Sequence, residues 1–271
     1  MNVLIVTDLD GSLLDHYTYS FTPAQESLDQ IRSLSIPLII NSSKTIAELV
    51  SLRLALNNNH PFIVENGAGV VIPEGYFSDY GEDLPLTNNF RLKTFGPELS
   101  DILKIIHELR DSMSVSFRGL FDMTIAEIAE LTGLSDVDAL KAKDRNFSEP
   151  IIWDDSDESW QAFSEKLSEY QISHHRGGRF IHLCGGGDKG SAVLWLKNLY
   201  RNSLKEEPEI IALGDGQNDV PMLKIADIPV IIRSPVNAIP TIPGHNDMIV
   251  TRKYGPAGWN NAILKILKQR L

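Results

Sequence analysis

Near the start of the sequence lies the stretch Val3-Leu4-Ile5-Val6-Thr7-Asp8-Leu9-Asp10-Gly11, which joins an unbroken apolar run to two aspartates. Such a run is typical of a strand buried on both faces, as in a parallel sheet. Ligands of these sheets bind beyond the carboxyl ends of the strands. Burying two carboxylates at such a position costs free energy unless a cation or a proton neutralises one of them. The stretch predicts a site at Asp8 and Asp10, with a solvated turn as the alternative, since turns favour aspartate and glycine.

Three further apolar runs, at residues 36–40, 209–213 and 228–232, are equally unbroken. Apolar residues at helical spacing follow several of these runs, for example after Thr45, which has the spacing of a capping box, and after Pro256. Strands that alternate with helices at both ends of the sequence indicate a doubly wound, Rossmann-like α/β core built on a parallel sheet.

The middle of the sequence has a different pattern, in which short extended segments lie between amphipathic helices. Helices are expected over residues 99–109, 124–134, 136–143 and 160–170, and strands over 114–117, 150–153 and 179–183. We therefore expect residues 85–183 to form an inserted α/β cap. Residues 1–84 and 184–271 would form the catalytic core.

Composition narrows the classes of function. The 271 residues carry a formal net charge of −11, so a polyanion such as nucleic acid is an unfavourable partner. The single cysteine, Cys184, permits no internal disulfide and no cysteine zinc cluster. The apolar runs are too short for a signal peptide or a membrane span, so we expect a cytoplasmic protein that binds no membrane. The oligomeric state is left open.

Two other strand ends carry polar residues. The run at 209–213 leads into Gly214-Asp215-Gly216-Gln217-Asn218-Asp219, whose carboxylates would suit Mg²⁺ together with those of the first strand. The alternative is a turn with a helix N-cap at Asp219, and both can hold. The run at 36–40 leads into Asn41-Ser42-Ser43-Lys44-Thr45, where hydroxyls and amides before a helix form an anion seat, or merely cap the helix.

Lys189 stands at the start of another expected helix, after Asp188. From there its side chain can reach over the same sheet edge and clamp a phosphate. The alternative is a solvated surface charge.

Taken in order, these residues resemble the haloacid dehalogenase-like phosphohydrolases. Asp8-x-Asp10-Gly-x-Leu matches the first motif of that superfamily, Ser42 the second, Lys189 the third, and Gly214-Asp215-Gly-x-x-Asp219 the fourth. The resemblance implies that Asp8 is the nucleophile in a phosphoryl transfer through an aspartyl phosphate, and that Asp10 is the general acid and base. It implies that Ser42 and Lys189 hold the phosphate. It also implies a Mg²⁺ ion bound by Asp8, the backbone carbonyl of Asp10, Asp215 and Asp219.

Nearly the whole sequence also resembles the mannosyl-3-phosphoglycerate phosphatases, a group within that superfamily. The resemblance rests on Ser42-Ser43-Lys44-Thr45, Glu65-Asn66-Gly67, Arg145 with Ser148-Glu149-Pro150, Gly178-Arg179-Phe180 with His182, and Gly255-Pro256 with Gly258-Trp259. It implies a phosphorylated sugar-glycerate substrate that is converted to mannosylglycerate, a compatible solute. Arg179, or else Arg145, would bind the substrate carboxylate. The remaining contacts would come from Ser43, Lys44, Asn66, Gly67, Glu149 and His182.

Other interpretations keep part of this chemistry. The substrate could be glucosyl-3-phosphoglycerate, sucrose phosphate or another sugar phosphate. A phosphomutase, or a phospho-binding module without catalysis, is a further alternative. A binding module would have no need of Asp10 or of a large cap.

Overall fold

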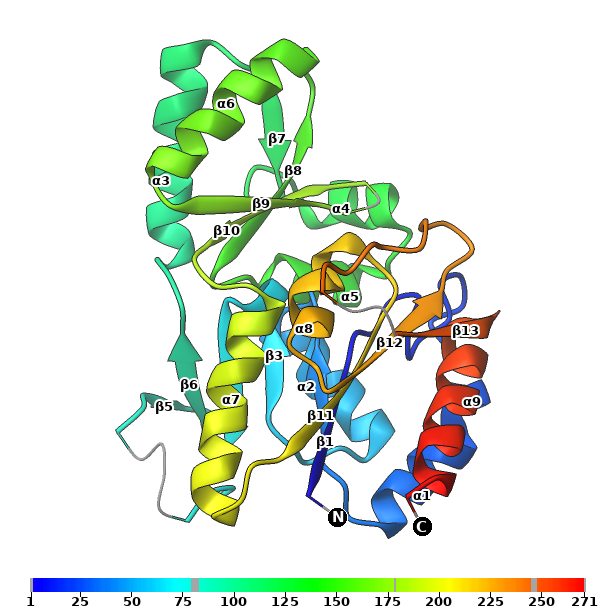
Figure 1. Cartoon of the computed structure of the whole chain (residues 1–271). Coiled ribbons are helices and arrows are strands. Elements are labelled where there is room, and N and C mark those ends of the chain that lie inside the picture. Colours follow the sequence, from blue (N-terminus) through cyan, green and yellow to red (C-terminus); the bar gives the residue numbers. More distant parts are fainter. Residues whose placement is uncertain (1, 79–82, 178, 245–247, 271) are drawn as a thin grey trace.

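The computed structural model describes residues 2–78, 83–177, 179–244 and 248–270, and its largest element is a nine-stranded sheet (Figure 1). The strand order is β13-β12-β11-β1-β2-β3-β4-β6-β5, and the first six of these strands are parallel. The strands are β1 Val3–Thr7, β2 Leu38–Asn41, β3 Phe62–Val64, β4 Gly69–Pro73, β5 Leu86–Thr87, β6 Phe90–Thr94, β11 Glu209–Gly214, β12 Ile228–Arg233 and β13 Ile249–Tyr254.

Helices cover both faces of this sheet. Val3 and Ile5 of β1 pack in one apolar cluster with α1, α2 and α9, whereas Leu4 and Val6 pack in a second cluster with α7 and α8. This arrangement confirms the doubly wound α/β core. The helices are α1 Gln25–Ser33, α2 Ile46–Leu56, α7 Lys189–Leu204, α8 Val220–Lys224 and α9 Gly255–Lys268, with 3-10 turns at η1 Thr22–Ala24, η2 Glu65–Gly67 and η3 Gln217–Asp219.

One edge of the large sheet is antiparallel and includes residues that we assigned to the cap. Strands β6 and β5, which lie within the range expected for the cap, continue the large sheet from β4. Both strands are short and partly exposed, which leaves them without an unbroken apolar run. The division into core and cap remains a prediction, and its first connection runs after β6.

The cap contains a second sheet, antiparallel, in the order β7-β8-β10-β9. Helices α3 and α6 pack on one face of it around Ile106, Phe163 and Leu183, and α4 and α5 lie between this sheet and the core (Figure 1). The elements are α3 Leu99–Met113, β7 Phe117–Gly119, α4 Ile125–Thr132, α5 Asp136–Lys143, β8 Ser148–Trp153, α6 Asp157–Glu169, β9 Ile172–Arg176 and β10 Ile181–Gly185.

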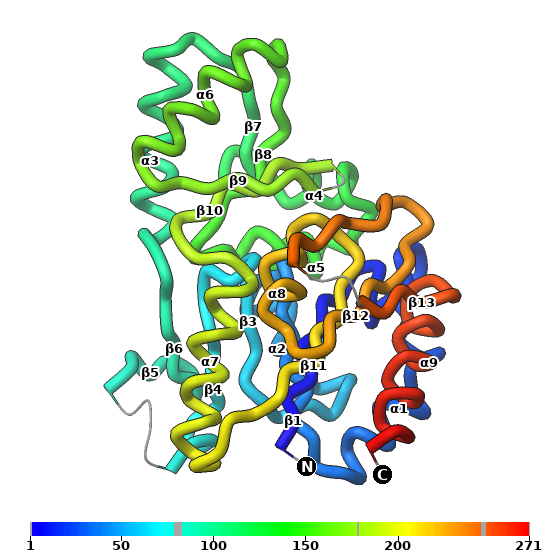
Figure 2. Tube along the Cα trace, in the orientation of Figure 1, coloured from blue at the N-terminus to red at the C-terminus, as the bar shows by residue number. Residues whose placement is uncertain are grey.

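Core and cap touch closely where the chain passes between them (Figure 2). A Cβ on Gly96 would lie 1.9 Å from the carbonyl oxygen of Gly185, so the two connections run side by side at backbone contact. A third contact comes from the loop between α5 and β8, whose Phe147 is buried in the core cluster with Phe62. These contacts anchor the cap to the core. Among the described helices, none has both the length and the apolar character needed to cross a membrane.

Candidate active site

Three side chains from distant parts of the sequence meet at the carboxyl end of β1. Lys189, at the start of α7, places Nζ 2.6 Å from Oδ1 of Asp8 and 2.6 Å from Oδ1 of Asp219. All three side chains are buried. Gly67 permits this approach, because a Cβ there would lie 2.1 Å from the carbonyl oxygen of Asp188, beside Lys189. The lysine is therefore not a solvated surface charge.

The loop after β11 supplies the other carboxylate. Asp215 accepts hydrogen bonds from Ser12 Oγ at 3.4 Å and from Asn237 Nδ2 at 2.9 Å. Oδ2 of Asp219 accepts from the backbone N–H groups of Asp215 and Gly216, at 2.9 Å each. The hydrogen bonds from the backbone to Oδ2 close the turn, while Oδ1 of Asp219 contacts Lys189. Asp219 therefore stabilises the turn and is also part of the site.

The carboxylates carry more negative charge than the single ammonium neutralises. Burial and then the nearby Asp219 raise the pKa of Asp8 well above its usual range, although Lys189 opposes them. The same two causes raise the pKa of Asp215 to about 6. Burial lowers the pKa of Lys189, but Asp219 and Asp8 outweigh it and raise that pKa above its ordinary value. A further positive charge would stabilise this site.

Asp8, Asp215 and Asp219 have the donor set of a metal site. Each offers one carboxylate oxygen, and these three oxygens lie within 4.8 Å of one another. Carboxylate oxygens are the preferred ligands of hard divalent cations. These residues can therefore hold a divalent cation.

The loop after β2 lies beside this cluster, because β1 and β2 are parallel neighbours. Ser42 is buried, its N–H donates to the carbonyl of Ile63, and its Oγ accepts from the N–H of Lys44 at 3.3 Å. Thr45 caps α2 in a capping box with Glu48, as expected. Hydroxyls and amides thus gather before a helix N-terminus, which is the setting of an anion seat.

Asp10 is held differently from Asp8. Its Oδ2 lies 2.9 Å from Nζ of Lys44, while its Oδ1 is buried without a hydrogen-bond partner among the described residues. Burial lowers the pKa of Lys44, but Asp10 and Glu48 outweigh this and raise it, so the lysine stays charged. An unpartnered carboxylate oxygen is uncommon in a folded protein, and it is open to a ligand's hydrogen-bond donor.

A cavity of about 190 Å³ joins this region to the cap. Core side chains of Asp10, Ser43 and Lys44 line it from one side, and Arg145 and His182 line it from the other. Burial and then Arg145 lower the pKa of His182 to about 3, so its ring is neutral, and Nδ1 has no hydrogen-bond partner among the described residues. The cavity brings five of the predicted site residues together.

Sequence comparison assigns the chain to a family. The model of the family described as haloacid dehalogenase-like hydrolase matches residues 5–255. The chain belongs to the haloacid dehalogenase-like hydrolases. A curated protein from Methanococcoides burtonii is 34% identical over 267 residues, and one from Persephonella marina is 37% identical over 271 residues. Each match covers 98% of both sequences, and both relatives are named glucosyl-3-phosphoglycerate/mannosyl-3-phosphoglycerate phosphatase.

Solved structures of lower identity share this fold of the haloacid dehalogenase-like hydrolases. A hydrolase of this type from Bacteroides thetaiotaomicron is similar at a TM-score of 0.66 and 20% identity, over 98% of this chain and all of that one. A Thermoplasma acidophilum protein is similar at a TM-score of 0.66 and 21% identity, over 99% and 98% of the two chains. The likeness includes the cap, since nearly the full length of each chain is covered.

Four predicted contact residues of this hydrolase lie away from the cavity. Asn66 accepts from Asn218 Nδ2 at 3.2 Å, so it and Gly67 stand between the core loops. Glu149 lies on the face of β8 that carries Ile151 towards α3 and α6, and its carboxylate accepts from the N–H of Phe121 at 2.7 Å. Arg179 is exposed and is not among the residues that line the cavity, while Gly178 lies outside the described residues.

The sequence interpretation missed two residues around the hydrolase site. Asn237 follows β12 and donates to Asp215, and it could have been found because it follows a predicted strand end. Glu65 was quoted only as part of a motif, and nothing in its spacing indicates that its carboxylate binds the cap loop at Asn146 and Phe147.

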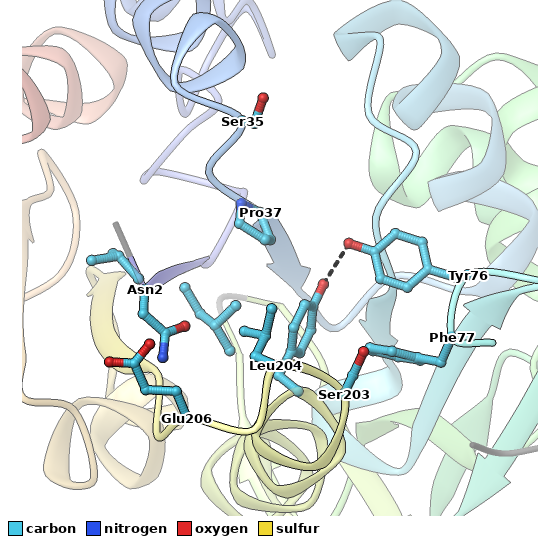
Figure 3. Close-up of a pocket in the computed structure, with 11 residues that line it drawn as sticks. Asn2, Ser35, Pro37, Tyr76, Phe77, Ser203, Leu204 and Glu206 are labelled. Carbon is cyan, nitrogen blue, oxygen red and sulfur yellow. Dashed lines mark hydrogen bonds between the residues drawn. The ribbon is translucent and has the colours of Figure 1, made fainter. Parts of the chain in front are cut away.

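Another large cavity, of about 410 Å³, lies at the opposite end of the sheet (Figure 3). Asn2 and Pro37 line it just before β1 and β2, whereas Asp8 follows β1. There the hydroxyl groups of Tyr76 and Tyr200 are 2.7 Å apart, and His60 Nδ1 is 2.7 Å from the Tyr76 hydroxyl. This cavity is separate from the carboxylate cluster.

Proposed function

We propose that this hydrolase is a Mg²⁺-dependent phosphatase that releases phosphate from a glycosyl-3-phosphoglycerate, either the mannosyl or the glucosyl ester, through an aspartyl phosphate. The observation that carries the proposal is the meeting of Asp8 with Lys189 and Asp219 at the carboxyl end of β1. The substrate class is supported by the names of relatives that are 34% and 37% identical over almost their full length.

In the first step, an oxygen of Asp8 attacks phosphorus and the bond from phosphorus to the glycerate oxygen breaks. Asp10 gives its proton to the departing oxygen. Oδ1 of Asp10 has no hydrogen-bond partner among the residues that the structure describes, which supports this role, since a proton or a ligand can bind there. Lys189 and the loop at Ser42 hold the phosphate oxygens, which keeps phosphorus in line with the attacking carboxylate.

In the second step, Asp10 is a carboxylate and takes a proton from water. The water oxygen attacks phosphorus, and the bond from phosphorus to the Asp8 oxygen breaks. Phosphate leaves, Asp8 is again a carboxylate, and Asp10 again carries a proton. Lys44, 2.9 Å from Asp10, stabilises the carboxylate form between the two steps.

Mg²⁺ would be held by Asp8, Asp215 and Asp219, together with the backbone carbonyl of Asp10, and would screen the charges of the phosphate and the nucleophile. The raised pKa values of Asp8 and Asp215 support a cation at this position. Asn237 and Ser12 orient Asp215 by their hydrogen bonds, and the turn N–H groups orient Asp219.

The carboxylate of the glycerate would bind Arg145 in preference to Arg179. Arg145 lines the cavity that also contains Asp10, whereas Arg179 is exposed outside it. Nε and Nη2 of Arg145 are hydrogen-bonded within the protein, and no hydrogen bond among the described residues uses Nη1. That nitrogen is free for an anionic group in the cavity.

The experiment is a substrate panel with released phosphate as the measurement. Mannosyl-3-phosphoglycerate and glucosyl-3-phosphoglycerate are compared with sucrose phosphate and glucose 6-phosphate, all with Mg²⁺. We expect kcat/KM for one or both glycerate esters to exceed the others by about ten- to 100-fold, the range of a charge-assisted hydrogen bond. Equal rates on all esters would overturn the substrate assignment. An isomerised sugar phosphate without free phosphate would indicate a mutase.

A further inference from the structure

Glu65 is a buried carboxylate in an unusual backbone conformation, just after β3. Its side chain is fully buried, and its φ is +50°, in the left-handed region that disfavours residues other than glycine. Backbone strain of this kind persists only where the surrounding contacts hold the residue in place, and it is common at functional sites. The phosphatase chemistry of Asp8 and Asp10 makes no use of Glu65.

Among the described residues, the carboxylate of Glu65 accepts hydrogen bonds from the cap loop between α5 and β8 and from the first residue of β8. Oε1 accepts from the N–H of Asn146 at 2.9 Å, and Oε2 accepts from the N–H of Phe147 at 3.1 Å and from Ser148 Oγ at 2.6 Å. These bonds link the end of a core strand to the cap. They fix the loop from which Arg145 projects.

Arg145 is bound by the same group of residues. Its Nε lies 3.6 Å from Oε2 of Glu65 and 3.1 Å from Ser148 Oγ, and its Nη2 donates to Ser148 Oγ at 2.8 Å and to the carbonyl of Ser43 at 2.9 Å. The bonds hold one edge of the planar guanidinium between the cap loop and the core loop after β2. The other edge, at Nη1, is left for a ligand in the cavity that Arg145 lines with Asp10.

Stability alone does not explain this arrangement. A buried ion pair gains little over well-packed apolar side chains of similar size, because desolvation opposes the attraction. The ion pair does, however, fix the orientation of a side chain. Here it fixes the orientation of the Arg145 guanidinium relative to the predicted phosphate seat at Ser42 and Ser43.

We propose that Glu65 is a positioning residue that, through Ser148, holds the guanidinium of Arg145 and so makes the enzyme select phosphate esters that carry a second anionic group near the phosphate. The proposal rests on the proposed function for its reaction. It goes beyond that function in assigning the selectivity to a residue that touches no substrate.

The test compares two small competitors of p-nitrophenyl phosphate hydrolysis. 3-Phosphoglycerate and glycerol 3-phosphate both carry a phosphate ester, and the first has a carboxylate where the second has a hydroxymethyl group. The measured quantity is the ratio of their inhibition constants, which a general loss of folded or active enzyme does not change. In the wild type we expect 3-phosphoglycerate to inhibit about ten- to 100-fold more strongly, the range for a charge-assisted hydrogen bond.

Three single variants, one double variant and a control complete the test. Arg145→Met should bring the ratio of the two inhibition constants to about one. Glu65→Gln should reduce this ratio to within about threefold of unity. In the double variant Glu65→Gln should have no further effect, because Glu65 acts through Arg145. Ser148→Ala, which removes only the bridging hydroxyl, should give a partial loss and serves if Glu65→Gln does not fold. Glu209→Gln, which breaks an ion pair with Arg270 at the start of β11, should keep the wild-type ratio.

The outcomes separate the two proposals. A ratio near unity in the wild type, an unchanged ratio in both Glu65→Gln and Ser148→Ala, or additive effects of Glu65→Gln and Arg145→Met would overturn the role of Glu65. If the ratios behave as expected but neither glycosyl-3-phosphoglycerate is hydrolysed, the proposed substrate is wrong and the role of Glu65 stands.

Discussion

At the scale of single residues, two aspartates that stand two positions apart have very different surroundings. Asp8 is buried against Lys189, while the side chain of Asp10 is 38% exposed and pairs with Lys44. Both residues follow β1, which ends at Thr7, so strand alternation does not set the directions of their side chains. The sequence pattern predicted the pair. It could not predict which cations they would meet, because Lys44 and Lys189 lie on other elements.

Asp10→Asn tests the acid–base role. The asparagine cannot give a proton to the leaving oxygen, so kcat should fall about 10²- to 10⁴-fold. Because the side chain is partly exposed, the thermal midpoint should change little. Phosphate release and thermal unfolding of the same preparations are the measurements, and a kcat within threefold of the wild type would contradict the assignment.

Glu149 gives a prediction about pH. Burial raises its pKa in the folded state to about 7 from an ordinary value of 4.5, although Phe121 and Arg145 oppose the shift. The folded state therefore holds a proton that the unfolded state releases, and stability from this group is present below pH 4.5 and lost as the pH rises through 7.

Glu149→Gln removes this loss. Relative to the wild type, the variant should gain free energy of unfolding as the pH rises from about 4.5 to about 7, by at most about 3 kcal/mol. Urea unfolding at several pH values measures the difference. A difference that stays constant over this range would show that Glu149 does not titrate there.

At the scale of elements, the predictable parts are the long or strongly patterned ones. The four unbroken apolar runs became β1, β2, β11 and β12, and the helix expected over 136–143 is α5. The strands that were missed lack that signal: β3 has three residues, and β13 carries exposed charged residues. Tertiary pairing, not local pattern, makes them strands.

Two capping boxes offer a matched comparison. Thr45 with Glu48 begins α2 in the core, and Thr124 with Glu127 begins α4 in the cap. The hydroxyl of Thr45 also donates to the carbonyl of Lys141 at 2.8 Å, which joins α2 to the end of α5.

Each threonine replaced by alanine should lose about 1 kcal/mol of stability, the usual effect of an N-cap. Thr45→Ala should also raise KM for the glycerate ester several-fold, because the cap then loses a bond to the predicted phosphate seat, while Thr124→Ala should leave KM unchanged. Steady-state kinetics with thermal unfolding separates these effects. Equal KM values for both variants would contradict a link between α2 and the cap.

At the scale of the whole molecule, the core sheet brings residues 8, 42, 189, 215 and 219 to one end, and the cap covers that end (Figure 1). The order of the motifs was sufficient to predict this meeting, because parallel strands end at one edge of a sheet. The cap contacts were not predictable to the same degree. Arg145 and Glu149 are four residues apart, yet Arg145 lines the cavity, whereas Glu149 lies outside it and accepts from the N–H of Phe121.

Removal of the metal tests the carboxylate cluster as a unit. Chelation should abolish turnover, and added Mg²⁺ should restore it. Because a ligand that binds only the folded state stabilises it, Mg²⁺ at 100 times its dissociation constant should add about 2.7 kcal/mol to the free energy of unfolding. Asp215→Asn should lose most of that gain. Full activity in excess chelator would contradict a metal at this site.

The most direct measurement of the central claim is phosphate release from glucosyl- and mannosyl-3-phosphoglycerate by the wild type and by Asp8→Asn, side by side. We expect turnover by the wild type with Mg²⁺ and a loss of at least about 10³-fold in the variant, which keeps the size of the side chain but not the nucleophile. A variant that retains turnover, or a wild type that releases phosphate from neither ester, would contradict it.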